Sequence, residues 1–180
     1  MNLPNKLTLL RILLIPVFII MMMLNIDNHY LIACLIFIVA SITDALDGHI
    51  ARKNNLITDF GKFMDPLADK LLVISALICM IEANLVAGWM VIIIVARELT
   101  VSILRAIAAA DGKVIAASGG GKIKTITQML AIILLLLGAN FGNGILLQLG
   151  FIFIIIATFL TLYSGIDYLY KNKELFMNSK

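Results

Sequence analysis

Residues 44–52 are DALDGHIAR and residues 61–69 are GKFMDPLAD, and both stretches lie within strongly apolar segments. They contain four aspartates: Asp44, Asp47, Asp65 and Asp69. The first two are three residues apart and the last two are four residues apart, so each pair lies on one face if its segment is helical. If the two helices are antiparallel and joined by a short loop, Asp47 and Asp65 lie at the same level, about 8–9 Å from that loop. Asp44 and Asp69 then lie level with each other at about 14 Å from it. The sequence therefore predicts four carboxylates gathered between two neighbouring helices.

The composition is that of a membrane protein. Of the 180 residues, 62% are hydrophobic, and the mean hydropathy is +1.05. An ordinary soluble domain is closer to half apolar, and one of this size could not bury so much apolar surface. The apolar segments are about 20 residues long, which suits helices crossing a hydrocarbon layer about 30 Å thick. Strand-like alternation is absent. We therefore expect an all-α, integral membrane bundle.

Six transmembrane helices are predicted within a single domain that spans residues 1–180. Their approximate ranges are 7–25, 30–53, 60–81, 86–109, 122–140 and 145–170. The turns at 25–29, 82–84 and 138–144 contain no Lys or Arg, whereas basic residues gather near the other connections and near both chain ends. The positive-inside rule then places the N- and C-termini in the cytoplasm. The four aspartates lie toward that cytoplasmic side of the cell membrane.

Four clustered carboxylates cannot all stay ionised without cations between them. Hard oxygen ligands suit Mg²⁺ or Mn²⁺, and four of them could hold two ions, which would form a clamp for displacement at phosphorus. Two alternatives remain open at this point. The acids could instead pair with Arg52, Lys62 and Lys70 to hold helices together. They could also bind cations in a non-enzymatic carrier, although the Gly- or Pro-broken helices typical of transporters are not evident.

The spacing of these residues also resembles a known signature. Residues 44–69 fit D-x2-D-G-x2-A-R-x8-G-x3-D-x3-D at every fixed position. That pattern resembles the signature of the CDP-alcohol phosphatidyltransferase family, whose members have a six-helix core of this length. Four flanking segments resemble the branch of the family that uses glycerol 3-phosphate as its acceptor; they are residues 3–11, 96–105, 121–125 and 164–168.

The resemblance implies an activity and roles for particular residues. The substrates would be CDP-diacylglycerol and glycerol 3-phosphate, and the products would be phosphatidylglycerophosphate and CMP. The four aspartates would hold the metals, with Asp69 also the candidate base. Gly48, Gly61 and Ala51 would leave room for the CDP-lipid, and Arg52 would meet its phosphate or stabilise the helix end. Family members are commonly homodimers, so we expect a homodimer in the membrane lipid.

A dianionic acceptor needs cations to bind it. Arg97 and Arg105 are about 80° apart around the axis of one predicted helix, so both can point into the bundle. Lys124 can enter the same region from the next predicted helix. Arginine binds phosphate through two parallel hydrogen bonds, which favours these three residues as the acceptor-phosphate site. Arg11 is a further candidate. Alternatively, Arg97 pairs with Glu98 or with a motif aspartate, and Arg105 extends to the cytoplasmic surface.

Other functions are less well supported. A sister enzyme with phosphatidylglycerol, serine or inositol as its acceptor would have the same aspartate motif. The cationic residues favour an acceptor with a phosphate, so they argue only against serine and inositol. Residues 118–122 lack the spacing of a phosphate-binding loop. Cys34 and Cys79 lie in apolar segments without metal-binding spacing. The basic residues are spread along the predicted membrane surface, as is usual beside transmembrane helices, so we expect no nucleic acid partner.

Overall fold

The fold comes from a computed structural model that describes the backbone of residues 3–53, 59–110 and 119–173. Side chains are described for 5–44, 64, 67–109, 121 and 123–173. The described residues form six helices and no strand. The helices are α1 (Leu3–Met23), α2 (His29–Lys53), α3 (Asp59–Glu82), α4 (Gly88–Ala110), α5 (Gly119–Phe141) and α6 (Gly144–Lys171). The all-α prediction is confirmed, and each helix matches one predicted range to within a few residues.

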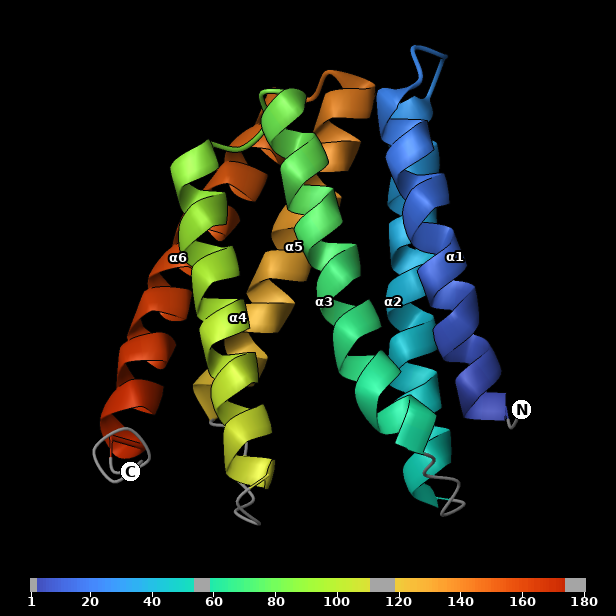
Figure 1. The fold of residues 1–180 in the computed structure, drawn as a ribbon. Helices are drawn as coiled ribbons and strands as arrows, with labels where there is room; N and C mark the ends of the chain where they lie inside the picture. Colours follow the sequence, from blue (N-terminus) through green and yellow to red (C-terminus); the bar gives the residue numbers. More distant parts are fainter. Residues whose placement is uncertain (1–2, 54–58, 111–118, 174–180) are drawn as a thin grey trace.

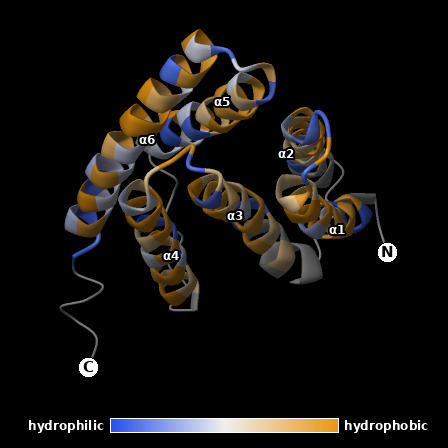
Figure 2. Ribbon diagram, turned by 90° about the horizontal axis from the view of Figure 1, so that it is seen from above, coloured by the Kyte–Doolittle hydropathy of each residue, from blue (hydrophilic) through white to orange (hydrophobic). Residues whose placement is uncertain are grey.

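The helices run up and down through the bundle (Figure 1). The start of α1 and the end of α6 lie at the same end of the bundle. The end of α2, the start of α3, the end of α4 and the start of α5 lie there too. Seen from above, α3 lies between the α1–α2 pair and α4 (Figure 2). Helix α5 packs on α6 and α2, and α4 packs on α6 and α3. The ends of α2 and α3 that adjoin residues 54–58 therefore meet near one end of the bundle.

Much of the outer surface is hydrophobic, as expected of a membrane protein. Large apolar side chains are exposed on several helices, including Ile92 and Ile145, each 69% exposed. Among the described residues, three segments are long and apolar enough to cross a bilayer: Asn5–Met23, Ile123–Phe141 and Gly144–Lys171. Charged residues interrupt the apolar runs of α2, α3 and α4. Six membrane crossings and cytoplasmic termini stay predictions.

The end of the bundle opposite the chain termini is held by a polar contact between the α1–α2 turn and the end of α5. Asn140 Nδ2 donates to Asn28 Oδ1 at 3.0 Å, and the Leu31 N–H donates to Asn140 Oδ1 at 3.1 Å. Asn28 has a φ of 59°, in the left-handed region that Asn tolerates better than most residues. These bonds tie the α1–α2 turn to the end of α5.

Helices α5 and α6 approach closely because glycine occupies their contact. A Cβ added at Gly138 would lie 2.8 Å from the backbone N of Leu147, and one added at Gly150 would lie 2.7 Å from Leu135 Cγ. Small residues at such positions allow membrane helices to pack backbone against backbone. The close approach fixes the position of α5, which contains Lys124.

The Gly138→Ala substitution is expected to destabilise the fold by about 1–3 kcal/mol, because the new methyl group meets backbone that cannot move independently. Gly144→Ala is the matched control, since an added Cβ there has no neighbour within 4 Å among the described residues. Thermal unfolding in detergent measures both. Equal melting temperatures for the two variants would contradict this account of the α5–α6 contact.

Candidate active site

The aspartate motif lies on α2 and α3, where these helices approach each other. Asp44 and Asp47 belong to α2, and Asp65 and Asp69 belong to α3. Side-chain positions are described for Asp44 and Asp69. The remaining predicted site residues of this region have side chains outside the described part of the chain; they are Asp47, Asp65, Gly48, Ala51, Arg52 and Gly61. The pairing of the four carboxylates at two levels therefore stays a prediction.

Asp44 is held by an arginine from the first helix. Arg11 Nη1 lies 2.8 Å from Asp44 Oδ1, and the Arg11 side chain is completely buried, whereas that of Asp44 is 39% exposed. Arg11 Nε also donates to the Ala40 carbonyl at 3.4 Å. The buried guanidinium compensates the charge of Asp44 and fixes its orientation. Arg11 thus connects α1 to the first turn of the motif, which favours a positioning role over direct capture of an acceptor.

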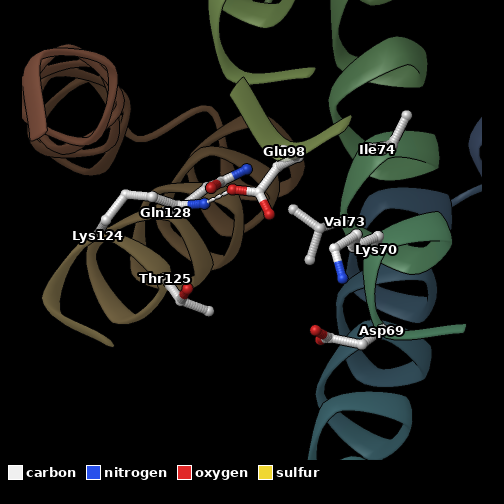
Figure 3. Close-up of a pocket in the computed structure, with 8 residues that line it drawn as sticks. All are labelled: Asp69, Lys70, Val73, Ile74, Glu98, Lys124, Thr125 and Gln128. Atoms are coloured by element: carbon white, nitrogen blue, oxygen red, sulfur yellow. Dashed lines mark hydrogen bonds and ion pairs between the residues drawn. The ribbon is translucent and has the colours of Figure 1, made fainter. Parts of the chain in front are cut away.

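Asp69 lines a polar pocket formed by three helices (Figure 3). Lys70 accompanies it from α3, Glu98 comes from α4, and Lys124 and Gln128 come from α5. Thr125, Val73 and Ile74 complete the lining. The pocket has a volume of about 30 Å³, which is room for one or two water molecules. Two carboxylates, two ammonium groups and an amide therefore line one pocket within a largely apolar bundle.

Glu98 connects the cations of this region. Its Oε1 accepts hydrogen bonds from Lys124 Nζ and from Arg97 Nη1, the latter at 3.2 Å. Lys124 is buried. A buried lysine is stable only when a partner compensates its charge. The pairing of Arg97 with Glu98, one of the alternatives that the sequence left open, is present in the structure. The same carboxylate also compensates the charge of Lys124.

The three predicted acceptor cations occupy different places. Lys124 lines the same pocket as Asp69, from the opposite side (Figure 3). Arg97 lines an apolar groove of about 310 Å³ between α4 and α6, where an added Cβ at Gly165 would lie 2.9 Å from Arg97 Cγ. Arg105 is exposed on α4, with its Cζ 5.6 Å from the centroid of the Tyr168 ring. Lys124 thus has the most direct access to a ligand near Asp69, and Arg97 reaches it through Glu98.

The described side chains provide only part of a metal site. No three His, Cys, Asp or Glu side chains gather around one point among those with described positions. Two of the four predicted ligands, Asp47 and Asp65, lie outside that set. The four acids are all hard oxygen donors, and this donor set fits Mg²⁺ or Mn²⁺ rather than a softer metal.

Three charged or amide residues of the pocket, Lys70, Glu98 and Gln128, are not among the site residues predicted from the sequence. The sequence suggests only ion pairs for Lys70 and Glu98, and no role for Gln128. A signal for Gln128 was available, because it follows Lys124 by four residues and so lies on the same face of an apolar helix. A polar side chain on the inward face of such a helix is a candidate for function or for helix contact.

Comparison with known proteins agrees with the motif. The family model for CDP-alcohol phosphatidyltransferase matches residues 1–163. A protein of Bacillus subtilis (strain 168) named CDP-diacylglycerol–glycerol-3-phosphate 3-phosphatidyltransferase is 44% identical, over 99% of this chain and 98% of its own length. A protein of the same name from Rickettsia bellii is 43% identical over 97% of both chains. A probable phosphatidylglycerophosphate synthase of Mycobacterium tuberculosis is 40% identical, over 93% of this chain and 79% of its own. The resemblance inferred from the sequence is confirmed, and the chain belongs to the CDP-alcohol phosphatidyltransferase family.

Proposed function

We propose that this chain transfers the phosphatidyl group of CDP-diacylglycerol to glycerol 3-phosphate, which gives phosphatidylglycerophosphate and CMP. The aspartate motif supports the reaction class. The names of relatives that match over nearly the full length support this donor and acceptor. The observation that carries the proposal is the pocket lined by both Asp69 and Lys124, because it combines a candidate base with a candidate phosphate ligand.

The reaction is a displacement at phosphorus. A hydroxyl oxygen of the acceptor forms a bond to the phosphorus that carries the diacylglycerol, and the bond from that phosphorus to the CMP oxygen breaks. Asp69 accepts the hydroxyl proton. The other motif aspartates, Asp44, Asp47 and Asp65, would hold two divalent ions, with Asp69 also within reach of one. Bound Mg²⁺ or Mn²⁺ would neutralise the diphosphate and the developing charge on the leaving group.

The CDP-lipid would bind on the α2–α3 side of the site, because the family motif lies on these two helices. Gly48, Gly61 and Ala51 are small residues within it, and they would let the nucleotide approach the backbone. Arg52 would meet a phosphate of the nucleotide. Arg11 orients Asp44 through the 2.8 Å ion pair described above. The site would face the cytoplasm at the cell membrane, in a homodimer surrounded by membrane lipid.

Acceptor binding requires an exchange of partners at Lys124. In the structure its charge is compensated by Glu98, and the pocket has room for little more than water. A dianionic phosphate is the stronger partner, so its arrival would replace the Glu98 carboxylate and widen the pocket. Glu98 would then remain paired with Arg97, the residue that precedes it on α4. We propose that Lys124 holds the acceptor phosphate directly, with Arg97 and Arg105 as further contributors.

The Lys124→Gln substitution is expected to raise the KM for glycerol 3-phosphate roughly 10- to 150-fold, the equivalent of one charge-assisted hydrogen bond. The KM for CDP-diacylglycerol should change little, because the motif region holds its diphosphate. Lys171→Gln is the matched control, since Lys171 is exposed and pairs only with Asp167 among the described residues. Steady-state CMP release, with each substrate varied in turn, provides the measurement. Equal changes in both KM values would make Lys124 a structural residue.

The choice of acceptor can be tested on the wild-type protein. Purified protein in detergent is supplied with CDP-diacylglycerol and one acceptor at a time: glycerol 3-phosphate, phosphatidylglycerol, serine or inositol. CMP release that depends on glycerol 3-phosphate is the expected result. Release with another acceptor alone would assign the chain to a sister activity of the family, and release with none would favour a cation carrier.

A further inference from the structure

Gln128 differs from the other polar side chains near it on α5. The Thr125 and Thr127 hydroxyls donate to the carbonyls of Gly121 and Ile123, at 3.0 and 2.8 Å. Lys124 is paired with Glu98. Gln128 is only 2% exposed, and its Nε2 is buried with no hydrogen-bond partner among the described residues. An amide donor in this condition is unfavourable unless something else binds it.

The unpaired amide belongs to the pocket of Asp69. Gln128 lines that pocket together with Asp69, Glu98 and Lys124 (Figure 3). It lies one helical turn from Lys124, so both side chains enter the pocket from the same face of α5. A polar residue in a membrane helix often serves to bind a neighbouring helix. Gln128 Nε2 has no such partner on the described parts of α3 or α4, which favours a ligand over a helix contact.

The chemistry of the acceptor supplies what this amide lacks. Glycerol 3-phosphate has a phosphate at one end, a terminal hydroxyl at the other and a second hydroxyl on the central carbon. With the phosphate at Lys124 and the terminal hydroxyl at Asp69, the central hydroxyl is the polar group left to be matched. We propose that Gln128 determines specificity for the acceptor by donating a hydrogen bond from Nε2 to this central hydroxyl oxygen. The inference rests on the proposed function and adds a residue to it.

The test compares two acceptors that differ only in that hydroxyl. 3-Hydroxypropyl phosphate keeps the phosphate and the terminal hydroxyl of glycerol 3-phosphate but lacks the central one. Gln128→Met keeps the length of the side chain and removes the donor. It is expected to lower kcat/KM for glycerol 3-phosphate about 2- to 13-fold, the equivalent of one neutral hydrogen bond. The same variant should leave kcat/KM for 3-hydroxypropyl phosphate nearly unchanged, so the preference for the natural acceptor falls by that factor.

Control variants separate this role from a structural one. Gln148→Met makes the same chemical change at an exposed position on α6 and should alter neither acceptor. Gln128→Asn retains a donor on a shorter side chain and should recover part of the preference. A fall of equal size for both acceptors in Gln128→Met, or no fall for either, would overturn the assignment while the proposed function stands. Absence of glycerol 3-phosphate-dependent CMP release in the wild-type protein would instead refute the proposed function, and the hydroxyl assignment with it.

Discussion

Asp69→Asn is expected to abolish measurable turnover while the protein still folds and inserts into the membrane. The substitution keeps the size of the side chain but removes both its charge and its ability to accept a proton. Loss of a general base alone lowers a rate by about 10²- to 10⁴-fold, and a weakened metal ligand would add to that. CMP release with CDP-diacylglycerol and glycerol 3-phosphate gives the activity, and elution as a single species in detergent gives the folded state.

A second aspartate provides the matched control for this experiment. Asp167→Asn makes the same change on α6, where the carboxylate pairs with Lys171 at 2.9 Å and lies outside the motif. It should leave turnover close to that of the wild type. Asp47→Asn and Asp65→Asn should behave like Asp69→Asn if the motif acts as one site. Motif variants that lose only thermal stability and retain activity would show that the acids hold helices together, as the alternative interpretation holds.

The helices could be predicted because each element has a local signal. Apolar runs of about 20 residues predict spanning helices, and polar turns with Asn and Gly separate them. The turn around Asn28 and the turn around Gly142, whose φ values are positive, lie in two of the predicted connections. Helix α5 begins at Gly119, earlier than predicted. Its first turn is the glycine-rich segment 119–121, which has low helix propensity and precedes the predicted start at residue 122.

The partners of the charged residues could not be predicted in the same way. Sequence spacing shows which side chains share a face of one helix, but pairs such as Arg11–Asp44 and Lys124–Glu98 join different helices. Which face of α1 meets α2, and how far α5 is displaced along α4, depend on packing between elements. The Asn28–Asn140 contact is another example, since its two partners are 112 positions apart in the sequence.

The predicted acceptor site shows that the angle between two residues around a helix does not by itself determine which residues they contact. The difference of about 80° between Arg97 and Arg105 allowed both to point into the bundle. In the structure Arg97 lies against Gly165 and Glu98, whereas Arg105 lies over Tyr168 at 5.6 Å. The position of α6 accounts for this difference, because it covers one flank of α4 and offers a glycine at one level and an aromatic ring at another. A role for Arg105 in binding the acceptor remains a prediction that Arg105→Ala can test.

Removal of divalent metal is expected to eliminate activity as completely as loss of a motif aspartate. Without cations, the diphosphate of the donor and the motif carboxylates repel each other, so the donor cannot take its place beside them. Activity should disappear in excess EDTA and return when Mg²⁺ or Mn²⁺ is added. Circular dichroism in EDTA serves as the control, since the helices should persist when the metal is gone.

Metal binding can also be counted without turnover. Mn²⁺ titrated into protein freed of metal, and followed by electron paramagnetic resonance, should show about two bound ions per chain if four carboxylates form a two-ion site. Asp44→Asn should weaken that binding, because it removes a carboxylate oxygen that Arg11 holds in place. Asp167→Asn should not, since Asp167 lies outside the motif. Full turnover in EDTA, or Mn²⁺ binding that is indifferent to Asp44→Asn, would show that the aspartates serve the reaction through their own charge and hydrogen bonds rather than as metal ligands.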